Sequence, residues 1–474
     1  MGILIAFIYD RIGLYNLGQA NMLIIFFAYS IASFYPNTIL GFFKELKIGL
    51  AVGFFVNGLQ IFAAIMTYSC YSLESNTGLC SVKFLGFLNL SVAALIGFFS
   101  NVFLWTGNYE FVDRLSTKAE KKVMFATYNS YLFFNNVTAN LLNIIFYSYE
   151  VNSLYVFSGS FVIFMVVTSG IYWFLPDLHG YVPEEDPQEH PVVQEKPEEV
   201  SCKLKDIQEL QAIELKKLKS GPLDTQSGAL AVPLVEPESK EKEENVKTNP
   251  NSKPASSRDL RSKEKESFMK TANLYMNLLH EDKYYAILPY LIQSGLFQGF
   301  SAGAIYRLVV AVYAGNQSVN EAYVKKMISV VLIGYSISAL IMSQIHKTLD
   351  TKTRNNIMKA NSCLFAILMI CQVFFSQYLT NIWLVAIPSL IFGAIDLTFQ
   401  QLIAVYLSES FEGSTEPYAL FKLIQNFICS IFMAVYIASS YSTYTILNAV
   451  SHVGLAIWFV AVFDKYNGTH RIEN

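Results

Sequence analysis

Residues 381–406 read NIWLVAIPSLIFGAIDLTFQQLIAVY, and this stretch decides the fold class. It has the ~20 apolar residues that a helix needs to cross a bilayer, and it lacks the period-two alternation of a barrel strand. Comparable apolar runs recur along the chain. We predict membrane-spanning helices near 17–36, 48–70, 83–105, 125–147, 153–176, 284–312, 327–345, 356–376, 381–406, 418–439 and 441–463. The chain is therefore expected to be an all-α, polytopic membrane protein that is solvated by the lipid bilayer.

Charge is concentrated in one segment between two of these runs. Residues 177–283 hold 38 of the 71 charged side chains, 22 acidic and 16 basic, whereas the other 367 residues hold 33. The segment is rich in Glu, Lys, Pro and Ser, a composition that buries too little apolar surface to fold. We therefore predict an N-terminal transmembrane half over 1–176, a disordered cytosolic linker over 177–283 and a C-terminal transmembrane half over 284–474.

The distribution of basic residues in the short loops indicates the orientation. One set of short loops holds ten Lys and Arg residues, and Lys422, Lys465 and Arg471 lie on the same side, which makes thirteen, whereas the opposite loops hold four. The positive-inside rule then places the linker and the C-terminus in the cytosol, although it does not identify the membrane. Cys70 and Cys80 end one outer loop, where they either form a disulfide or remain two unpaired thiols. Asn316 begins an Asn-Gln-Ser sequon in another outer loop and is a candidate for N-glycosylation.

Asp396 is the only charged residue between Lys359 and Glu409. On a helix, Ser389, Asp396 and Gln400 fall on one face, with Asp396 roughly 22 Å from the outer end of its run at 1.5 Å per residue. A carboxylate at that depth costs several kcal/mol unless it has a partner or a cavity. Asp396 is therefore a candidate for binding or coupling. The alternative is a structural Asp that accepts hydrogen bonds from neighbouring side chains.

A second polar face is expected on the run 125–147. Four amide side chains recur there at spacings of 7, 4 and 3 residues, which places them within about 60° of one another around a helix. They are Asn129, Asn136, Asn140 and Asn143. Lipid would not face four amides, so this surface either lines a cavity or forms interhelical hydrogen bonds at ~0.6 kcal/mol each.

Several function classes find no support in the sequence. The net charge of −3 gives no basic surface for nucleic acid. No GxSxG, HExxH or P-loop motif occurs, and no His or Cys spacing is typical of a metal site. We therefore predict that the chain is not an enzyme, with no catalytic residues, no metal and no cofactor.

The region around Asp396 resembles a known family. The uncoordinated-93-like branch of the major facilitator superfamily has similar motifs at Gly393-Ala394-Ile395-Asp396 with Gln400 or Gln401, and at Glu416-Pro417-Tyr418-Ala419-Leu420-Phe421-Lys422 with Gln425. It has related segments at Leu104-Trp105-Thr106-Gly107-Asn108-Tyr109 and at Asn140-Leu141. The layout of two helical halves joined by a cytosolic insert agrees with that superfamily. Residues 1–9 are expected to be the tail of a first helix that is largely missing, which leaves eleven full spans.

The resemblance implies two functions. Members of the family are described as ion-channel regulatory subunits, as chaperones for other membrane proteins, or as presumed transporters. We expect an accessory protein that binds a channel or another membrane protein, because the first helix and the loop at 40–49 (LGFFKELKIG) depart from the transporter pattern. The alternative is a secondary transporter of a small solute or ion, with Asp396 as the titratable group.

Overall fold

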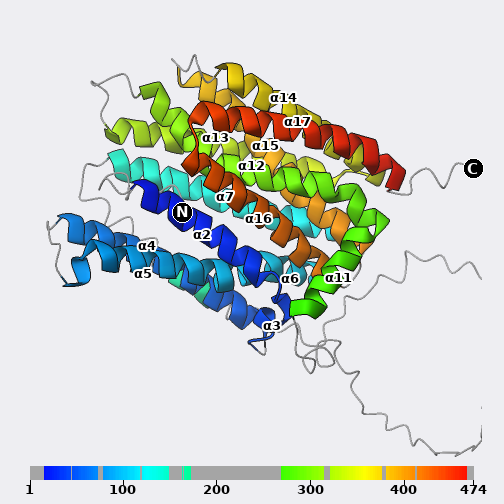
Figure 1. Cartoon of the computed structure of the whole chain (residues 1–474), viewed down its shortest axis with the longest axis horizontal. Coiled ribbons are helices and arrows are strands. Elements are labelled where there is room, and N and C mark those ends of the chain that lie inside the picture. Colours follow the sequence, from blue (N-terminus) through cyan, green and yellow to red (C-terminus); the bar gives the residue numbers. More distant parts are fainter. Residues whose placement is uncertain are drawn as a thin grey trace, which may run out of the picture. The chain divides into compact units, whose positions relative to one another are not determined.

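The computed structural model describes residues 15–43, 45–72, 78–117, 120–148, 163, 165–171, 268–313, 321–375, 381–411 and 414–466. Helices make up the N-terminal part of these ranges: α2 (Tyr15–Ala32), α3 (Pro36–Leu40), α4 (Leu46–Ser72), α5 (Val82–Leu95), α6 (Asn108–Leu115) and α7 (Lys121–Ser148). The C-terminal part contains α11 (Phe268–His280), α12 (Asp282–Tyr313), α13 (Glu321–Lys347), α14 (Thr351–Phe375), α15 (Trp383–Ser410), α16 (Glu416–Ala438) and α17 (Tyr441–Tyr466) (Figure 1). No strand occurs within these ranges.

Two π-helical segments, η2 (Ile96–Ser100) and η3 (Val102–Gly107), join α5 to α6 in one continuous helix over Val82–Leu115. A short 3-10 turn, η1 (Gly78–Cys80), precedes α5. Cys80 in this turn forms a disulfide with Cys70 near the end of α4, with their Cα atoms 5.1 Å apart. The disulfide therefore ties the end of α4 to the start of α5.

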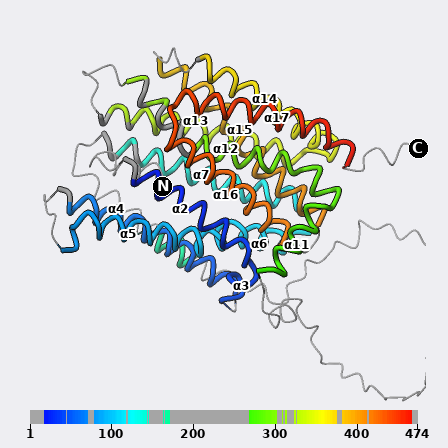
Figure 2. The backbone as a smooth tube through the Cα atoms, in the orientation of Figure 1, coloured from blue at the N-terminus to red at the C-terminus, as the bar shows by residue number. Residues whose placement is uncertain are grey.

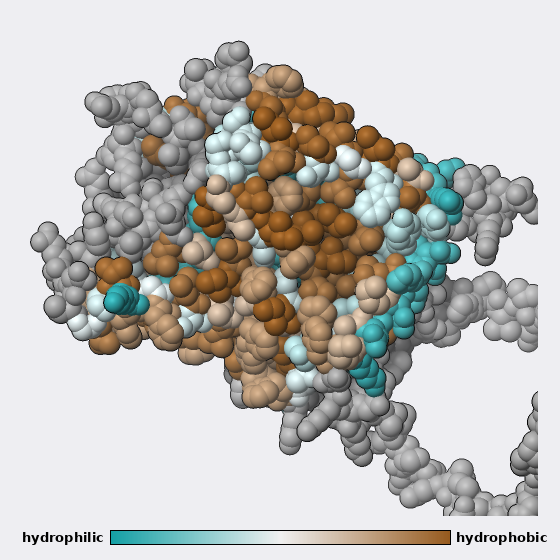
Figure 3. Space-filling view, viewed as in Figure 1, coloured by the Kyte–Doolittle hydropathy of each residue, from teal (hydrophilic) through white to brown (hydrophobic). Residues whose placement is uncertain are grey.

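Seven helices of the described residues are long and apolar enough to cross a membrane: α4, the continuous α5–α6 helix, α13, α14, α15, α16 and α17. A shorter apolar helix spans Leu17–Ala32, and α7 and α12 occupy two further predicted spans. The predicted span 153–176 lies largely outside the described residues, as does Asn316. Figure 3 shows hydrophobic residues over most of one face and a group of hydrophilic ones at the end where α11 lies. This distribution suits a lipid solvent.

Helix α11 lies within the range that we predicted as a linker. It places Thr271, Tyr275 and Leu278 on one buried face, at the spacing of an amphipathic helix. The Tyr275 hydroxyl donates to the Ser33 carbonyl after α2, and the ring centroids of Phe268 and Phe34 lie 4.9 Å apart. The C-terminal half therefore begins with a helix that packs on the N-terminal half.

The two halves meet along two pairs of helices, α2 with α16 and α7 with α13 (Figure 2). Serines allow close contact in the second pair. Ser343 Oγ donates to the Ala126 carbonyl at 2.6 Å, and Ser130 Oγ donates to Ser343 Oγ at 2.8 Å. Small hydroxyl side chains are typical of membrane helix interfaces, because they let backbones approach and still satisfy polar atoms.

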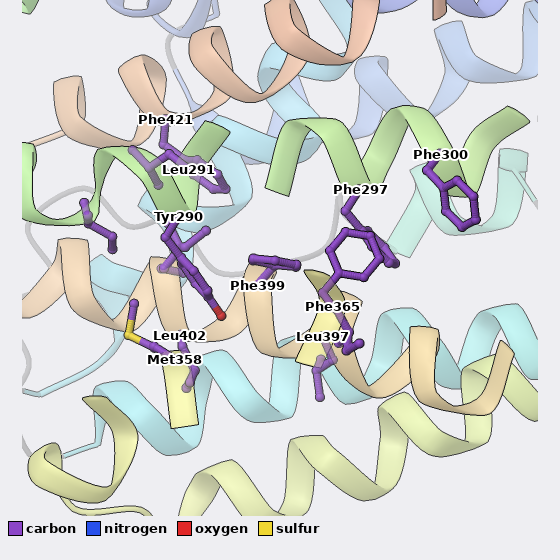
Figure 4. Packing of buried hydrophobic residues seen from close by; sticks show 14 of the residues in the cluster. Tyr290, Leu291, Phe297, Phe300, Met358, Phe365, Leu397, Phe399, Leu402 and Phe421 are labelled. Carbon is purple, nitrogen blue, oxygen red and sulfur yellow. The ribbon is translucent and has the colours of Figure 1, made fainter. Parts of the chain in front are cut away.

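An aromatic cluster fixes the position of α15, the helix that carries Asp396 (Figure 4). The ring centroid of Phe399 lies 4.6 Å from that of Tyr290 in α12 and 6.1 Å from that of Phe365 in α14. The ring centroids of Phe297 in α12 and Phe365 lie 4.9 Å apart. Such pairs contribute ~0.5–1.5 kcal/mol each beyond the burial of their surface. The cluster thereby holds α15 against α12 and α14.

Candidate functional site

Asp396 lies within α15 and is held by hydrogen-bond donors. The Tyr335 hydroxyl of α13 donates to Asp396 Oδ2 at 2.6 Å. The side chain of Gln400, one helical turn further on, hydrogen-bonds to the same carboxylate. Asp396 and Gln400 are half-buried, whereas Tyr335 is buried. A hydrogen bond to a charged group contributes ~1.5–3 kcal/mol, so these donors offset much of the cost of the buried charge.

Gly393 brings α13 close enough for the bond between Tyr335 and Asp396. A Cβ atom at position 393 would lie 1.9 Å from the Tyr335 carbonyl oxygen and 2.5 Å from Ser338 Oγ. No side chain fits that space. The two helices therefore approach at a distance that only glycine permits, one turn before the carboxylate.

Lys422 of α16 supplies the positive charge of the site. Its Nζ donates to Gln400 Oε1 at 3.0 Å and to Gln425 Oε1 at 2.8 Å, and the residue is 3% exposed. Among the described residues no carboxylate lies within 4.0 Å of its Nζ. Gln400 thus stands between Asp396 and Lys422 and contacts both.

The N-terminal half contributes aromatic rings to Lys422. The ring centroids of Trp105 in η3 and Tyr109 in α6 lie 5.0 and 5.1 Å from Lys422 Nζ. Phe421, on the same helix as Lys422, lies 4.4 Å away. The Tyr109 hydroxyl also donates to Gln400 Oε1 at 3.4 Å. Trp105 lies in a π-helical segment, a local change of helical pitch that often occurs at functional sites.

The hydrogen bonds continue from α16 into α12. Gln425 Nε2 donates to Ser294 Oγ at 3.3 Å, and Asn426 Nδ2 donates to the Lys422 carbonyl at 2.5 Å. One connected path therefore runs from Tyr335 through Asp396, Gln400, Lys422 and Gln425 to Ser294, across four helices. We call this path the charged network. It combines one acid and one base, and the N-terminal half covers it with Trp105 and Tyr109.

Other predicted residues of α15 lie apart from the charged network. Ser389 is buried, and its Oγ donates to the Val385 carbonyl of its own helix at 2.7 Å. Gln401 is fully buried beside His346 of α13. Of the residues that helical spacing placed on one face, Gln400 lies next to Asp396, whereas Ser389 lies two turns away and makes a local bond.

The described asparagines of α7 make hydrogen bonds within their own helix. Asn129 is buried and donates to the Phe125 carbonyl at 3.0 Å, while Asn140 donates to the Asn136 carbonyl at 2.8 Å. Asn136 is exposed on the surface of the helix, and the side chain of Asn143 lies outside the described residues. No hydrogen bond within the described ranges joins these amides to the charged network.

A second polar group joins the two halves at the end of the bundle where α6 ends and α16 begins. Asp113 and Lys121 form an ion pair at 3.0 Å, both largely buried. Asp113 also accepts from the Ser408 hydroxyl of α15, and Lys121 Nζ donates to the Ser408 carbonyl at 3.4 Å. We call Asp113, Lys121 and Ser408 the polar clasp. It holds the halves together at the end that the loop charges assign to the cytosol.

Within the described residues no group of three or more His, Cys, Asp and Glu side chains could hold a metal ion. Sequence reasoning counted Lys422 among the charges on the cytosolic side, because it lies near the first residue of the predicted span 418–439. Helix α16 begins at Glu416, so Lys422 lies about two turns inside it and is buried. Tyr335 gave no signal in the sequence, because a tyrosine in an apolar run is usually a packing residue.

Comparison with solved structures identifies the fold. A bacterial homologue of the iron transporter ferroportin in an outward-facing state is similar, with a TM-score of 0.55 at 10% identity over 98% of this chain and 94% of that one. The major facilitator superfamily proton:xylose symporter XylE gives 0.54 at 12% identity over 95% of this chain and 87% of that one. A partially occluded inward-open form of XylE from E. coli gives 0.53 at 12% identity, over 95% and 88%. No protein-family model and no curated protein matches the sequence. The chain is an integral, multi-pass membrane protein with the major facilitator superfamily fold.

Proposed function

We propose that this chain is a secondary transporter that moves a small solute or ion across a membrane. One observation carries the proposal: an acid and a base, Asp396 and Lys422, are bridged by Gln400 within membrane-spanning helices. Charges at such depth are costly, and they usually mark substrate or ion pathways. Transporters of this fold place their binding sites between the two halves, where the charged network meets Trp105 and Tyr109.

The surrounding contacts suit alternating access, in which the halves part at one end and then at the other. The polar clasp closes one end, and it consists of bonds that break when α6 and α7 move away from α15. The charge of Asp396 affects both Tyr335 and Gln400, because both donate hydrogen bonds to its carboxylate. Binding of a proton or another cation there would change these bonds. That change is the coupling step we assign to Asp396.

The accessory role at a channel, which the family resemblance also implies, is favoured by no specific observation among the described residues. The fold resembles solved transporters, and a charge-bridging network is of direct use for binding a solute. The proposal is therefore for transport.

Because the solute is unknown, the test should screen many. Proteoliposomes that contain the purified full chain would be incubated with a metabolite extract under an imposed pH gradient, and their contents identified by mass spectrometry. We expect at least one solute to accumulate above empty vesicles, and Asp396→Asn to reduce its uptake by at least about tenfold, the loss of one charge-assisted interaction.

Asp350→Asn is the matched control. Asp350 is exposed between α13 and α14 and accepts from the Lys352 and Thr353 amides at 3.1 and 3.2 Å. Asparagine caps a helix about as well as aspartate, so this variant should transport like wild type. Equal uptake by Asp396→Asn and wild type would remove Asp396 from the mechanism. Vesicles that accumulate no solute would argue against transport itself.

A further inference from the structure

The two charges of the site are compensated unequally. The Asp396 carboxylate receives hydrogen bonds from Tyr335 and Gln400. The Lys422 ammonium has three N–H groups, and two of them reach the neutral amide oxygens of Gln400 and Gln425. Within the described residues no carboxylate lies within 4.0 Å of it. A buried cation without a direct counter-ion is poorly stabilised, so the unmet need of the site is for negative charge at Lys422.

Three aromatic rings surround the Lys422 ammonium group. Trp105, Tyr109 and Phe421 lie 4.4–5.1 Å from Lys422 Nζ, and their faces attract a cation more weakly than a desolvated anion does. Trp105 and Tyr109 belong to the N-terminal half, whereas Lys422 belongs to the C-terminal half. Their contact with Lys422 therefore lasts only while the halves are together at the end closed by the polar clasp.

We propose that the site binds a small monovalent anion on Lys422, and that Trp105 and Tyr109 take the anion's place when the halves close. The inference rests on the proposed transport function and names its substrate class, a carboxylate or an inorganic oxyanion. When the polar clasp opens, the two rings leave Lys422 and free its third N–H group for the anion. Gln400 and Gln425 stay on the same half as Lys422 and hold its side chain in place.

A cation on Asp396 is the competing occupant, since Asp396 is more exposed than Lys422. Such a ligand would place a second positive charge near Lys422 and would compete with the donors Tyr335 and Gln400. An anion on Lys422 displaces only aromatic faces and meets a free donor. The arrangement of partners thus favours the anion.

Trp105 itself provides the readout. The chain has four tryptophans, so replacing Trp173, Trp383 and Trp458 with Phe leaves Trp105 as the only one. This full-length protein, in detergent, would be titrated with sodium acetate, L-lactate, benzoate, nitrate and chloride, each replacing gluconate at constant ionic strength. In a separate arm tetramethylammonium would replace sodium. We expect at least one anion to shift the Trp105 emission saturably, because the ring leaves the ammonium group.

Substitutions at Lys422 decide whether that response belongs to the site. Lys422→Gln should abolish it, Lys422→Arg should retain it, and Lys326→Gln outside the site should behave like the parent. No response to any of the anions would overturn the proposal, as would an unchanged response in Lys422→Gln. A response to tetramethylammonium alone would assign the site to a cation and overturn it too.

A second variant tests the proposal independently, in case Lys422→Gln does not fold. Trp105→Leu removes one competing ring, so anion affinity, measured by thermal shift, should rise about 2-fold to 30-fold, the range of one cation–π contact. An unchanged anion affinity would contradict the proposal that Trp105 and the anion compete for Lys422. Anion binding without uptake by proteoliposomes would refute transport but leave the anion site standing. Uptake of a neutral or cationic solute without anion binding would refute the anion site and leave the transport function standing.

Discussion

Replacing Tyr335 with Phe removes one hydroxyl group from the interior of the bundle and leaves the ring in place. That hydroxyl donates to Asp396 Oδ2 at 2.6 Å, and Tyr335 is 9% exposed, so water replaces the lost donor poorly. A hydrogen bond to an ionised carboxylate contributes ~1.5–3 kcal/mol. We therefore expect Tyr335→Phe to lower the free energy of unfolding by about that amount.

The same substitution combined with Asp396→Asn isolates the contribution of the charge. Asparagine keeps an acceptor oxygen but is neutral, and neutral hydrogen bonds between membrane helices average ~0.6 kcal/mol. Tyr335→Phe should therefore cost about 1–2.4 kcal/mol less in the Asn background than in the Asp background. A double-mutant cycle measures this difference directly.

Unfolding would be followed by circular dichroism in mixed micelles as the fraction of dodecyl sulfate is raised, at one pH for all variants. Tyr131→Phe on α7 is the control, because Tyr131 is 68% exposed and its loss should change the free energy by less than about 0.5 kcal/mol. Equal costs of Tyr335→Phe in the two backgrounds would refute the reasoning. Asp396 would then not be a charged acceptor.

Three further predictions test other parts of the bundle. Asp113→Asn should weaken the polar clasp and shift the fluorescence emission of Trp105 to longer wavelength, because water then reaches the ring. An unchanged spectrum would contradict the role of Asp113 in holding the two halves together. Gly393→Ala should lower the free energy of unfolding by ~1–3 kcal/mol in the same assay. Gly454→Ala is the control, because an added Cβ there meets no atom within 4 Å, and equal effects of the two substitutions would refute the close approach of α13 and α15. Cys70→Ser should cost about 2.7 kcal/mol, the entropy of closing a loop of this length, and a variant as stable as the parent would show that the disulfide constrains little.

The helices were predictable because each has to satisfy two local requirements. A segment that crosses lipid needs enough apolar residues in a row, and its backbone must bond within itself. Both requirements can be read from residues such as 381–406 without knowledge of any partner. Helix α11 was missed because its buried face, Thr271, Tyr275 and Leu278, follows directly on a long charged segment.

The candidate site was only partly predictable. The rarity of charge identified Asp396, and helical spacing added Gln400, but the same spacing also suggested Ser389, which bonds within its own helix. Spacing gives the direction of a side chain from its own helix axis and says nothing of the neighbouring helix. The four asparagines of α7 illustrate the same limit, since Asn129 is buried and Asn136 is exposed.

Composition and run length are enough to predict a bundle of membrane helices with one acid far from the ends of its run, because these two properties control partition into lipid. The partners of that acid depend on how the helices pack. Gly393 admits Tyr335 of α13, and α16 carries Lys422 to Gln400, although its place near the start of the predicted span suggested only a charge at the cytosolic end. These contacts join residues up to 61 positions apart, as in the bond from Tyr335 to Asp396, and only the packing of helices brings such residues together.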